Sequence, residues 1–543
     1  MLSYRKLAMR VLGRPLHTRG IDSPRPASQR AAAFILTAAM LTTLAAPAFA
    51  DIWRIEDGDI TVKAGETEGT NKVSQGTNKD VVDTNTIITN SNKNTASSHT
   101  VTIEAKDKDD KVEVTLKDVN IDTSSRNKAA VSVTGEGDTN IKLDGDNALK
   151  SDIYRSGIYG SGSGSLTISG GENDSLTAQG GSGANGISSS GSLTISGGTV
   201  TANGDDGGRG ISSSGSVTIS GGSTVTANGG SGTISGGDGI CSSGGVTISG
   251  GSTVTANGGN GGSLVGGDGI RSGGGLTVSD GTVTAKGGNG DSKDGYGGDG
   301  IRSGGVVTIS GNTVNAAGGY GGKVGGYGIC SFDRVAISGG TVEAAGGNGS
   351  TGGGSGIYSS VIDLSGSLEL TAKAGSSNGK ALSQNGKELD LDTIKDKLDP
   401  GAKVTTNANG ETKEVSIPRP VEPEGPVIPE ESSSSSDSGS ATPSAPASPL
   451  PGLTVTDKDG QRISYTSTQS GNTLTVCVGR FTASFRISLA ALRQLRAEGI
   501  ETITFQTILC STTLSVDELL AMGGEDAEAV LTHRFTDSSL TVG

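Results

Sequence analysis

The stretch that decides the fold is Ser192–Asn203, Ser-Leu-Thr-Ile-Ser-Gly-Gly-Thr-Val-Thr-Ala-Asn, which follows Gly186-Ile187. Variants of this phrase recur along the chain, and a Gly-Ile dipeptide precedes each of them. The isoleucines of these dipeptides lie at positions 158, 187, 211, 240, 270, 301, 329 and 357. Repeats of 24 to 31 residues at a nearly constant period predict a solenoid, in which each repeat contacts only its neighbours.

Short polar–apolar alternations within the phrase identify the kind of solenoid. Leu193–Ser196 and Val200–Ala202 alternate with the period of a strand, and glycines that tolerate sharp corners separate them. Three short strands and three corners per repeat predict an all-β fold, a right-handed parallel β-helix. The residues expected to face its core are Ile187, Ile195, Val200, Ile211, Ile219 and Val225.

Changes in composition divide the chain into four parts. We expect a signal peptide at 1–50, the β-helix at 51–417 with its regular repeats at 157–372, a Pro/Ser-rich linker at 418–452 and a small α+β domain at 453–543. No proline occurs between Pro47 and Pro400, as a continuous hydrogen-bonded ladder requires. Leu391–Leu398 is expected to form a short helix that caps the last rung.

The first 50 residues have the pattern of an export signal. They carry seven basic residues and one acid, and the uncharged run Ala31–Ala50 ends in Ala-Phe-Ala. This pattern predicts cleavage before Asp51 and an extracellular location, free or at the cell surface, with no membrane span left after cleavage. A retained anchor is the alternative, because about 20 apolar residues can span a bilayer. No Leu-Pro-x-Thr-Gly motif for covalent attachment to a cell wall is present.

The charge of the chain limits its partners. The net charge is −14, and removal of residues 1–50 leaves 36 basic and 56 acidic residues, a net charge of −20. Such a surface disfavours nucleic acid and anionic membranes as partners. It also weakens, without excluding, the binding of anionic polysaccharide.

Cysteines and histidines offer no catalytic constellation. Cys241 and Cys330 lie three rungs apart, about 14 Å at strand spacing, too far for a disulfide, so we expect free thiols. Cys477 and Cys510 share the C-terminal domain and are either bridged or buried as two thiols. Only His99 and His533 follow residue 50, in different regions, and both are expected at the surface. The chain therefore has too few histidines in one place for a His-based catalytic triad or a zinc site. We therefore expect no enzyme.

Stacking of the repeats produces two columns of charged residues. Asp238, Asp268 and Asp299 lie two residues before the isoleucine, and Arg271 and Arg302 lie one residue after it. One interpretation is a row of turn residues with Asp268–Arg271 and Asp299–Arg302 as weak surface ion pairs. The other is a Ca²⁺ site formed by the three aspartates, because carboxylate oxygens suit a hard cation and like charges repel.

Three tyrosines stand out in a chain with 3% aromatic residues. Tyr296, Tyr320 and Tyr327 fall in neighbouring corner loops. Exposed tyrosines can stack on sugar faces and form hydrogen bonds through their hydroxyls. Simple coverage of the solenoid edge explains them equally well. With Arg271 and Arg302 they form the candidate ligand-binding set.

The repeats resemble a known family. The residues that carry the resemblance are Ala129–Asp138 (Ala-Ala-Val-Ser-Val-Thr-Gly-Glu-Gly-Asp), Lys142–Lys150 and Ser192–Ala202. They are similar to the carbohydrate-binding, pectate-lyase-like parallel β-helix proteins of anaerobic Gram-positive bacteria, over about residues 100–375. The resemblance implies binding of acidic plant polysaccharide such as polygalacturonate, bound calcium and no cleavage.

Three functions therefore remain for testing. The first is a secreted, non-catalytic protein that binds or adheres to acidic plant or host polysaccharide. The second is a polysaccharide lyase of the pectate-lyase type, for which Arg271 and Arg302 beside the aspartates are the candidate residues. The third is a structural spacer at the cell surface that presents the C-terminal domain.

Overall fold

A computed structural model describes residues 52–418, except 377, and 452–542 with gaps at 457–461, 464, 471, 479–481, 508–510, 523–526 and 534–537. The expected signal peptide (1–50) and nearly all of the expected linker (419–451) lie outside the described residues. The chain divides into two compact units, Met1–Pro423 and Glu424–Gly543. No helix among the described residues is long and apolar enough to cross a membrane.

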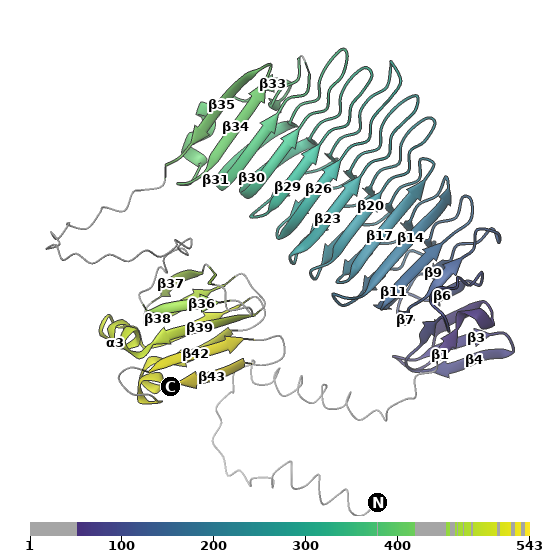
Figure 1. Ribbon diagram of the computed structural model, residues 1–543, viewed down its shortest axis with the longest axis horizontal. Coiled ribbons are helices and arrows are strands. Elements are labelled where there is room, and N and C mark those ends of the chain that lie inside the picture. The colour runs from purple at the N-terminus through teal and green to yellow at the C-terminus, as the bar shows by residue number, and fades with distance from the viewer. Residues whose placement is uncertain are drawn as a thin grey trace, which may run out of the picture. The chain divides into compact units, whose positions relative to one another are not determined.

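The first unit is the predicted parallel β-helix, with about 13 turns of three strands each. Successive turns stack in register, so that Ile187 pairs with Ile211, which in turn pairs with Ile240. Figure 1 shows the strands stacked side by side from the purple N-terminal end to the green C-terminal end. The repeat period therefore predicted both the fold and the register.

Each regular turn contributes one strand to each of three faces. The first face contains β12 (Ile158–Gly160), β15 (Ile187–Ser189), β18 (Ile211–Ser213), β21 (Ile240–Ser242), β24 (Ile270–Ser272) and β27 (Ile301–Ser303). The second contains β13 (Leu166–Ser169), β16 (Leu193–Ser196), β19 (Val217–Ser220), β22 (Val246–Ile248), β25 (Leu276–Val278) and β28 (Val307–Ile309). The third contains β14 (Ser175–Ser182), β17 (Thr199–Asp205), β20 (Thr224–Asn228), β23 (Ser252–Asn257), β26 (Gly281–Lys286) and β29 (Thr313–Ala317). Two long strands, β30 (Ile329–Ala345) and β31 (Ile357–Lys373), then pass through all three faces.

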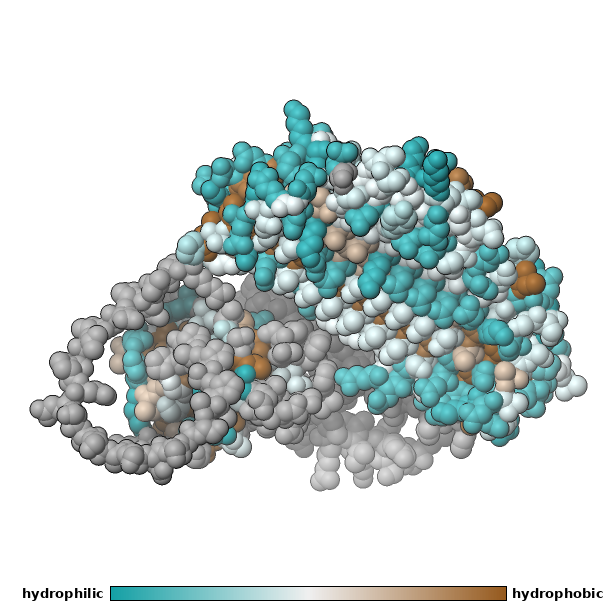
Figure 2. All heavy atoms as spheres, turned by 45° about the horizontal axis from the view of Figure 1, so that its top comes forward, coloured by the Kyte–Doolittle hydropathy of each residue, from teal (hydrophilic) through white to brown (hydrophobic). Residues whose placement is uncertain are grey.

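One continuous apolar core runs through the unit, from Trp53 to Val415. The six residues predicted to face inward are at most 1% exposed, which confirms the assignment. Threonine, serine and glycine occupy most of the outer positions, and Figure 2 shows the visible outer face of the solenoid as mostly hydrophilic or near neutral. Burial of one apolar stripe per strand thus stabilises every turn.

Glycine-rich loops connect the third face to the first face of the next turn, and they stack in register as well. We call residues 229–239, 258–269, 287–300, 318–328 and 346–356 the glycine-loop stack. Their outgoing and returning limbs exchange backbone hydrogen bonds: the Gly267 amide donates to the Gly259 carbonyl (2.8 Å), and the Gly288 amide donates to the Gly267 carbonyl (2.8 Å). A Cβ atom on Gly267 would overlap the carbonyl oxygen of Gly237. The sequence predicted only corners here, and the close backbone packing explains the glycine content.

Irregular elements cover both ends of the solenoid. At the N-terminal end β2 (Ile60–Ala64), β3 (Asn71–Gln75) and β4 (Asn78–Asp83) form antiparallel hairpins that the sequence did not predict. The less regular N-terminal turns use β1 (Ile52–Arg54), η1 (Ile55–Asp57), β5 (Ile87–Thr89), β6 (Val101–Ala105), β7 (Lys111–Lys117), β8 (Asn120–Asp122), β9 (Val131–Gly135), β10 (Asp138–Asp144) and β11 (Asp146–Lys150). The C-terminal end is covered by β32 (Leu382–Gln384), β33 (Lys387–Glu388), η2 (Leu391–Lys397), β34 (Lys403–Ala408) and β35 (Glu411–Ser416). The predicted capping helix is thus present, as the 3₁₀ helix η2.

The second unit is small and mixed, as predicted. Its sheets are β36 (Leu453–Thr456), β39 (Ala483–Ser488), β42 (Glu528–His533) and β43 (Ser538–Val542), and β37 (Thr466–Ser470), β38 (Thr473–Cys477), β40 (Thr502–Gln506) and β41 (Ser511–Ser515). Two helices accompany them, α3 (Leu489–Ala497) and α4 (Val516–Met522). The expectation of a surface His533 is wrong: it is fully buried, edge-on to the Phe485 ring at 5.6 Å.

Candidate functional site

A groove of about 560 Å³ lies between the first face of the solenoid and the returning limbs of the glycine loops. Three arginines line it, Arg209, Arg271 and Arg302, together with Asp238 and Asp268. We call this the arginine groove. Backbone of the returning limbs, including Gly237 and Gly267, forms its wall. The sequence columns at Asp and Arg therefore meet in one cavity.

Arg271 and Arg302, which line the groove, occupy the outward-facing central position of the short strands, and we call this position the floor column. In register along the axis this column reads Ser212, Cys241, Arg271, Arg302, Cys330 and Tyr358. Arg271 and Arg302 are direct partners on adjacent strands, at the ordinary strand spacing of about 4.8 Å. Two arginine side chains from adjacent turns therefore line the groove.

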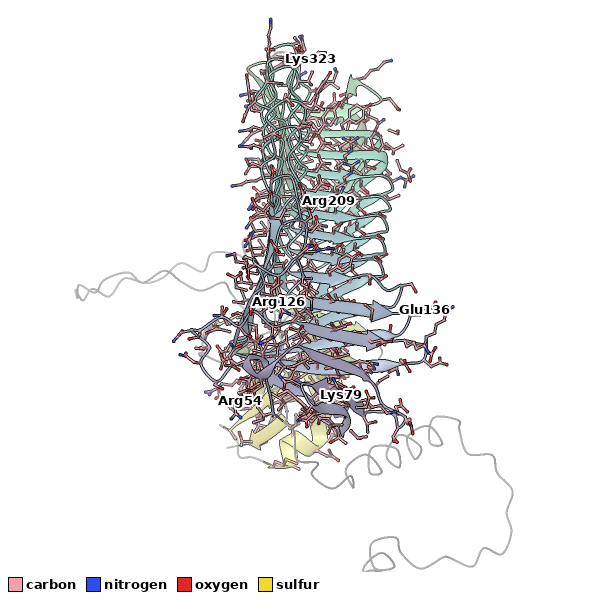
Figure 3. The ribbon with its side chains drawn as sticks, turned by 90° about the vertical axis from the view of Figure 1, so that its right-hand side faces the viewer. Arg54, Lys79, Arg126, Glu136, Arg209 and Lys323 are labelled. Atoms are coloured by element: carbon pink, nitrogen blue, oxygen red, sulfur yellow. The ribbon has the colours of Figure 1, made fainter. Side chains whose placement is uncertain are left out.

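Arg209 is a site residue that the sequence interpretation missed. It occupies the aspartate column, one turn before Asp238, and its side chain reaches the floor, where Nη1 lies 3.4 Å from the Ser212 hydroxyl. Its Nε lies 3.2 Å from Oδ2 of Asp238. The signal that could have found it is its place two residues before Ile211, in the same column as the aspartates. Figure 3 shows Arg126, Arg209 and Lys323 in that order along the solenoid axis.

The aspartate column is a buried hydrogen-bonded ladder and not a solvated row of turn residues. Asp238, Asp268 and Asp299 are 6%, 5% and 4% exposed. Oδ1 of each accepts the backbone amide of the equivalent residue in the next turn, from Asp268 to Asp238 at 2.9 Å, from Asp299 to Asp268 at 2.8 Å, and from Tyr327 to Asp299 at 2.7 Å. The carboxylates thus tie successive turns together.

The ion pairs of the groove differ from those expected. Asp299 and Arg302 do face each other, at 3.5 Å, but Asp238 pairs with Arg209. Arg271 is exposed, and the described residues place no carboxylate within 4.0 Å of its guanidinium, so the expected Asp268–Arg271 pair is absent. Burial, followed by repulsion from Asp299 and Asp238, raises the pKa of Asp268. Burial also raises the pKa of Asp299.

The aspartate ladder offers calcium few free oxygens. Oδ1 of each aspartate already accepts an amide, and Oδ2 of Asp238 and of Asp299 faces an arginine. Among the residues that the structure describes, no cluster of three or more His, Cys, Asp or Glu side chains could hold a metal ion. Calcium binding at Asp238, Asp268 and Asp299 stays a prediction.

The three candidate tyrosines divide into two places. All three belong to the glycine-loop stack. Tyr296 and Tyr320 are 45% and 47% exposed, and the Lys323 ammonium lies 5.5 Å from the Tyr296 ring centre. Tyr327 lies in the aspartate column of the stack, half-buried, and stacks on Tyr358 with ring centres 4.8 Å apart. Only Tyr327 lies beside the arginines of the floor.

The remaining reactive groups are held in structural roles. Cys241 and Cys330 are free, as predicted, and burial raises their pKa values to about 11 and about 12, so both thiols stay protonated. Cys477 is also free, whereas Cys510 lies outside the described residues. Nδ1 of His99 lies 3.3 Å from Asp59, a carboxylate that also binds Arg126.

Comparison of the chain with protein-family models, curated proteins and solved structures found no match. The site must therefore be interpreted from its own geometry: a groove along the axis of a solenoid, lined at three of its five turns by an arginine and containing buried carboxylates.

Proposed function

We propose that this chain is a secreted, non-catalytic protein that binds acidic polysaccharide in the arginine groove. The β-helix fold is compatible with polysaccharide-binding and lyase-type proteins. Sugar carboxylates or sulfates are planar or compact anions that a guanidinium binds through two parallel hydrogen bonds. The predicted leader at 1–50 supports secretion.

The observation that carries the proposal is the unpaired guanidinium of Arg271 beside Arg302. Their positions are directly paired on adjacent strands, and only Arg302 has a carboxylate partner. Like charges at this separation repel, and an anionic ligand across both would remove the repulsion. The rung spacing of about 4.8 Å is close to the length of one sugar residue in an extended polysaccharide. Each sugar of a linear polyanion could thus contact one turn of the solenoid.

Two other functions remain alternatives. A lyase would need a base that removes a proton from the sugar ring, and arginine stays protonated in proteins, which disfavours Arg271 and Arg302 in that role. A structural spacer would not explain why Arg271 and Arg302 occupy adjacent positions in the groove. Each alternative predicts a result that differs from that of the proposal in the same measurements.

The test is titration calorimetry of the full secreted chain with polygalacturonate, and with dextran as a neutral polymer. We expect binding to polygalacturonate alone, weakened by salt, because exposed charges are screened. The double variant Arg271→Ala, Arg302→Ala should lose about tenfold or more in affinity, since each charge-assisted hydrogen bond contributes about 1.5–3 kcal/mol. Arg334→Ala is the matched control: this arginine is half-exposed and pairs with Asp363 outside the groove.

The same preparation separates the alternatives. Accumulation of unsaturated oligosaccharides over many turnovers would establish a lyase. If the chain binds no acidic polymer, the structural spacer would be the function that remains. Equal loss of affinity in Arg334→Ala and in the groove variant would show attraction to the whole surface and contradict a specific site.

A further inference from the structure

The end of the arginine groove is marked by one large residue in a column of small ones. Two residues beyond the floor position, successive turns carry Ser214, Ser243, Gly273, Gly304 and Phe332. The small residues leave an open shelf along the floor. Phe332 interrupts this shelf one turn beyond Arg302, and its side chain is 56% exposed. A phenylalanine on a hydrophilic face in a chain with 3% aromatic residues needs a reason.

Phe332 contacts the groove through Arg302. The guanidinium carbon of Arg302 lies 5.3 Å from the centre of the Phe332 ring, within the range of a cation–π contact. The same guanidinium faces Asp299 at 3.5 Å. Arg302 is thus oriented by a buried carboxylate and an exposed ring, and Phe332 keeps more than half of its surface open to solvent.

Aromatic rings also replace charges in the two neighbouring columns. Tyr327 takes the place of the aspartates, and Tyr358 follows Cys330 in the floor column. The two tyrosines stack with planes 17° apart. Cys330 is only 2% exposed although it occupies the same outward position as Arg271 and Arg302, so the open floor ends at Arg302.

We propose that Phe332 is an aromatic subsite of the arginine groove, on which the ring of a sugar at one end of the bound acidic oligosaccharide stacks. The inference rests on the proposed function and adds a direction and a length to it. The lining residues span five turns, from Asn185 to Arg302, and Phe332 stands one turn further on, so Asn185 to Phe332 covers five rung spacings of about 4.8 Å. The ligand is then an acidic chain of about five to six sugars, with carboxylates at Arg271 and Arg302 and an apolar ring face on Phe332.

The test uses the full chain and oligogalacturonates of two to eight sugars in calorimetry. Affinity should rise with length up to about six sugars and then level off. Phe332→Ala should weaken the longer oligosaccharides about three- to tenfold, and Phe332→Tyr should restore binding, because stacking of this kind is moderate in strength. Val82→Ala is the control, since Val82 is an exposed apolar residue (62%) in β4, at the N-terminal end of the solenoid and not in the groove.

A second readout separates stacking from an indirect effect on Arg302. Sugar ring protons placed over Phe332 should shift upfield in the NMR spectrum of the bound oligosaccharide, and Phe332→Ala should remove that shift. Wild-type affinity in Phe332→Ala, or bound sugar protons without the shift, would overturn the subsite while leaving the proposed function intact. Absence of any binding by the wild-type protein would overturn both.

Discussion

A glycine-to-alanine change in the glycine-loop stack should destabilise the solenoid. Gly298 is buried in a returning limb, and its φ lies outside the left-handed region, so steric contact alone opposes a side chain. A Cβ at Gly298 would overlap the carbonyl oxygen of Gly267 and lie 2.7 Å from that of Gly266, whereas ordinary contact begins at about 3.4 Å. The limb must therefore move by more than half an ångström.

Such a movement breaks hydrogen bonds on both sides. The Gly298 amide donates to the Gly288 carbonyl at 2.9 Å, and its carbonyl accepts from the Gly319 amide at 2.8 Å. A buried hydrogen bond left unmade costs roughly 1–3 kcal/mol, and overpacking costs a similar amount. We expect Gly298→Ala to lower the free energy of unfolding by about 2–4 kcal/mol.

Gly352→Ala is the matched control, because a Cβ there meets no atom within 4 Å and the backbone is not left-handed. It should be neutral or stabilising by about 0.4–1 kcal/mol, through the lower entropy of the unfolded chain. Calorimetric melting and hydrogen exchange of the loop amides measure both variants. Indistinguishable unfolding of Gly298→Ala and Gly352→Ala would refute close packing of the loops as the reason for the glycines.

Three further predictions concern charge. Because burial raises its folded pKa to about 8, Asp268 contributes stability that is complete below about pH 4 and is lost as pH rises through 8, so Asp268→Asn should remove this part of the pH dependence of the solenoid's melting temperature. His533 has the opposite sign: burial lowers its pKa, so the C-terminal unit should lose stability as pH falls below about 6.5, and His533→Gln should melt independently of pH in this range. The predicted calcium site requires that calcium raise the melting temperature of the wild type and not that of Asp238→Asn, Asp268→Asn; an identical response of both proteins to EDTA would contradict it.

The regular spacing of the apolar residues was enough to predict most of the fold. An isoleucine two residues after each Asp or Asn sets the register of the turn, because a slip would expose a buried residue in every strand. The glycine-loop stack and the terminal hairpins have no apolar period, so their packing could not be predicted from alternation. Gly-Gly pairs before six of the eight Gly-Ile dipeptides, such as Gly266-Gly267 and Gly297-Gly298, were the available signal.

The site was predicted in part for a related reason. Register placed Asp268 beside Asp299 and Arg271 beside Arg302 correctly, because these residues lie a fixed distance from the core isoleucine. Side-chain reach and burial do not follow from register. One interpretation of the sequence therefore paired Asp268 with Arg271 and Asp299 with Arg302, whereas only the second pair forms and Asp238 is bound by Arg209 of the preceding turn.

The aspartate ladder explains why the groove keeps a free arginine. Asn185 accepts the Arg209 amide at 2.8 Å in the same way that Asp238 accepts the Asp268 amide, so the turn needs a side-chain acceptor and not a negative charge. The turn itself does not use the negative charge of the aspartates. That charge instead orients the neighbouring arginines. Asp238 orients Arg209 and Asp299 orients Arg302, whereas burial and its two acidic neighbours disfavour ionisation of Asp268, between them. A neutral carboxyl attracts a guanidinium less than a carboxylate does, so Arg271 stays open to an anionic ligand between two arginines that are already oriented.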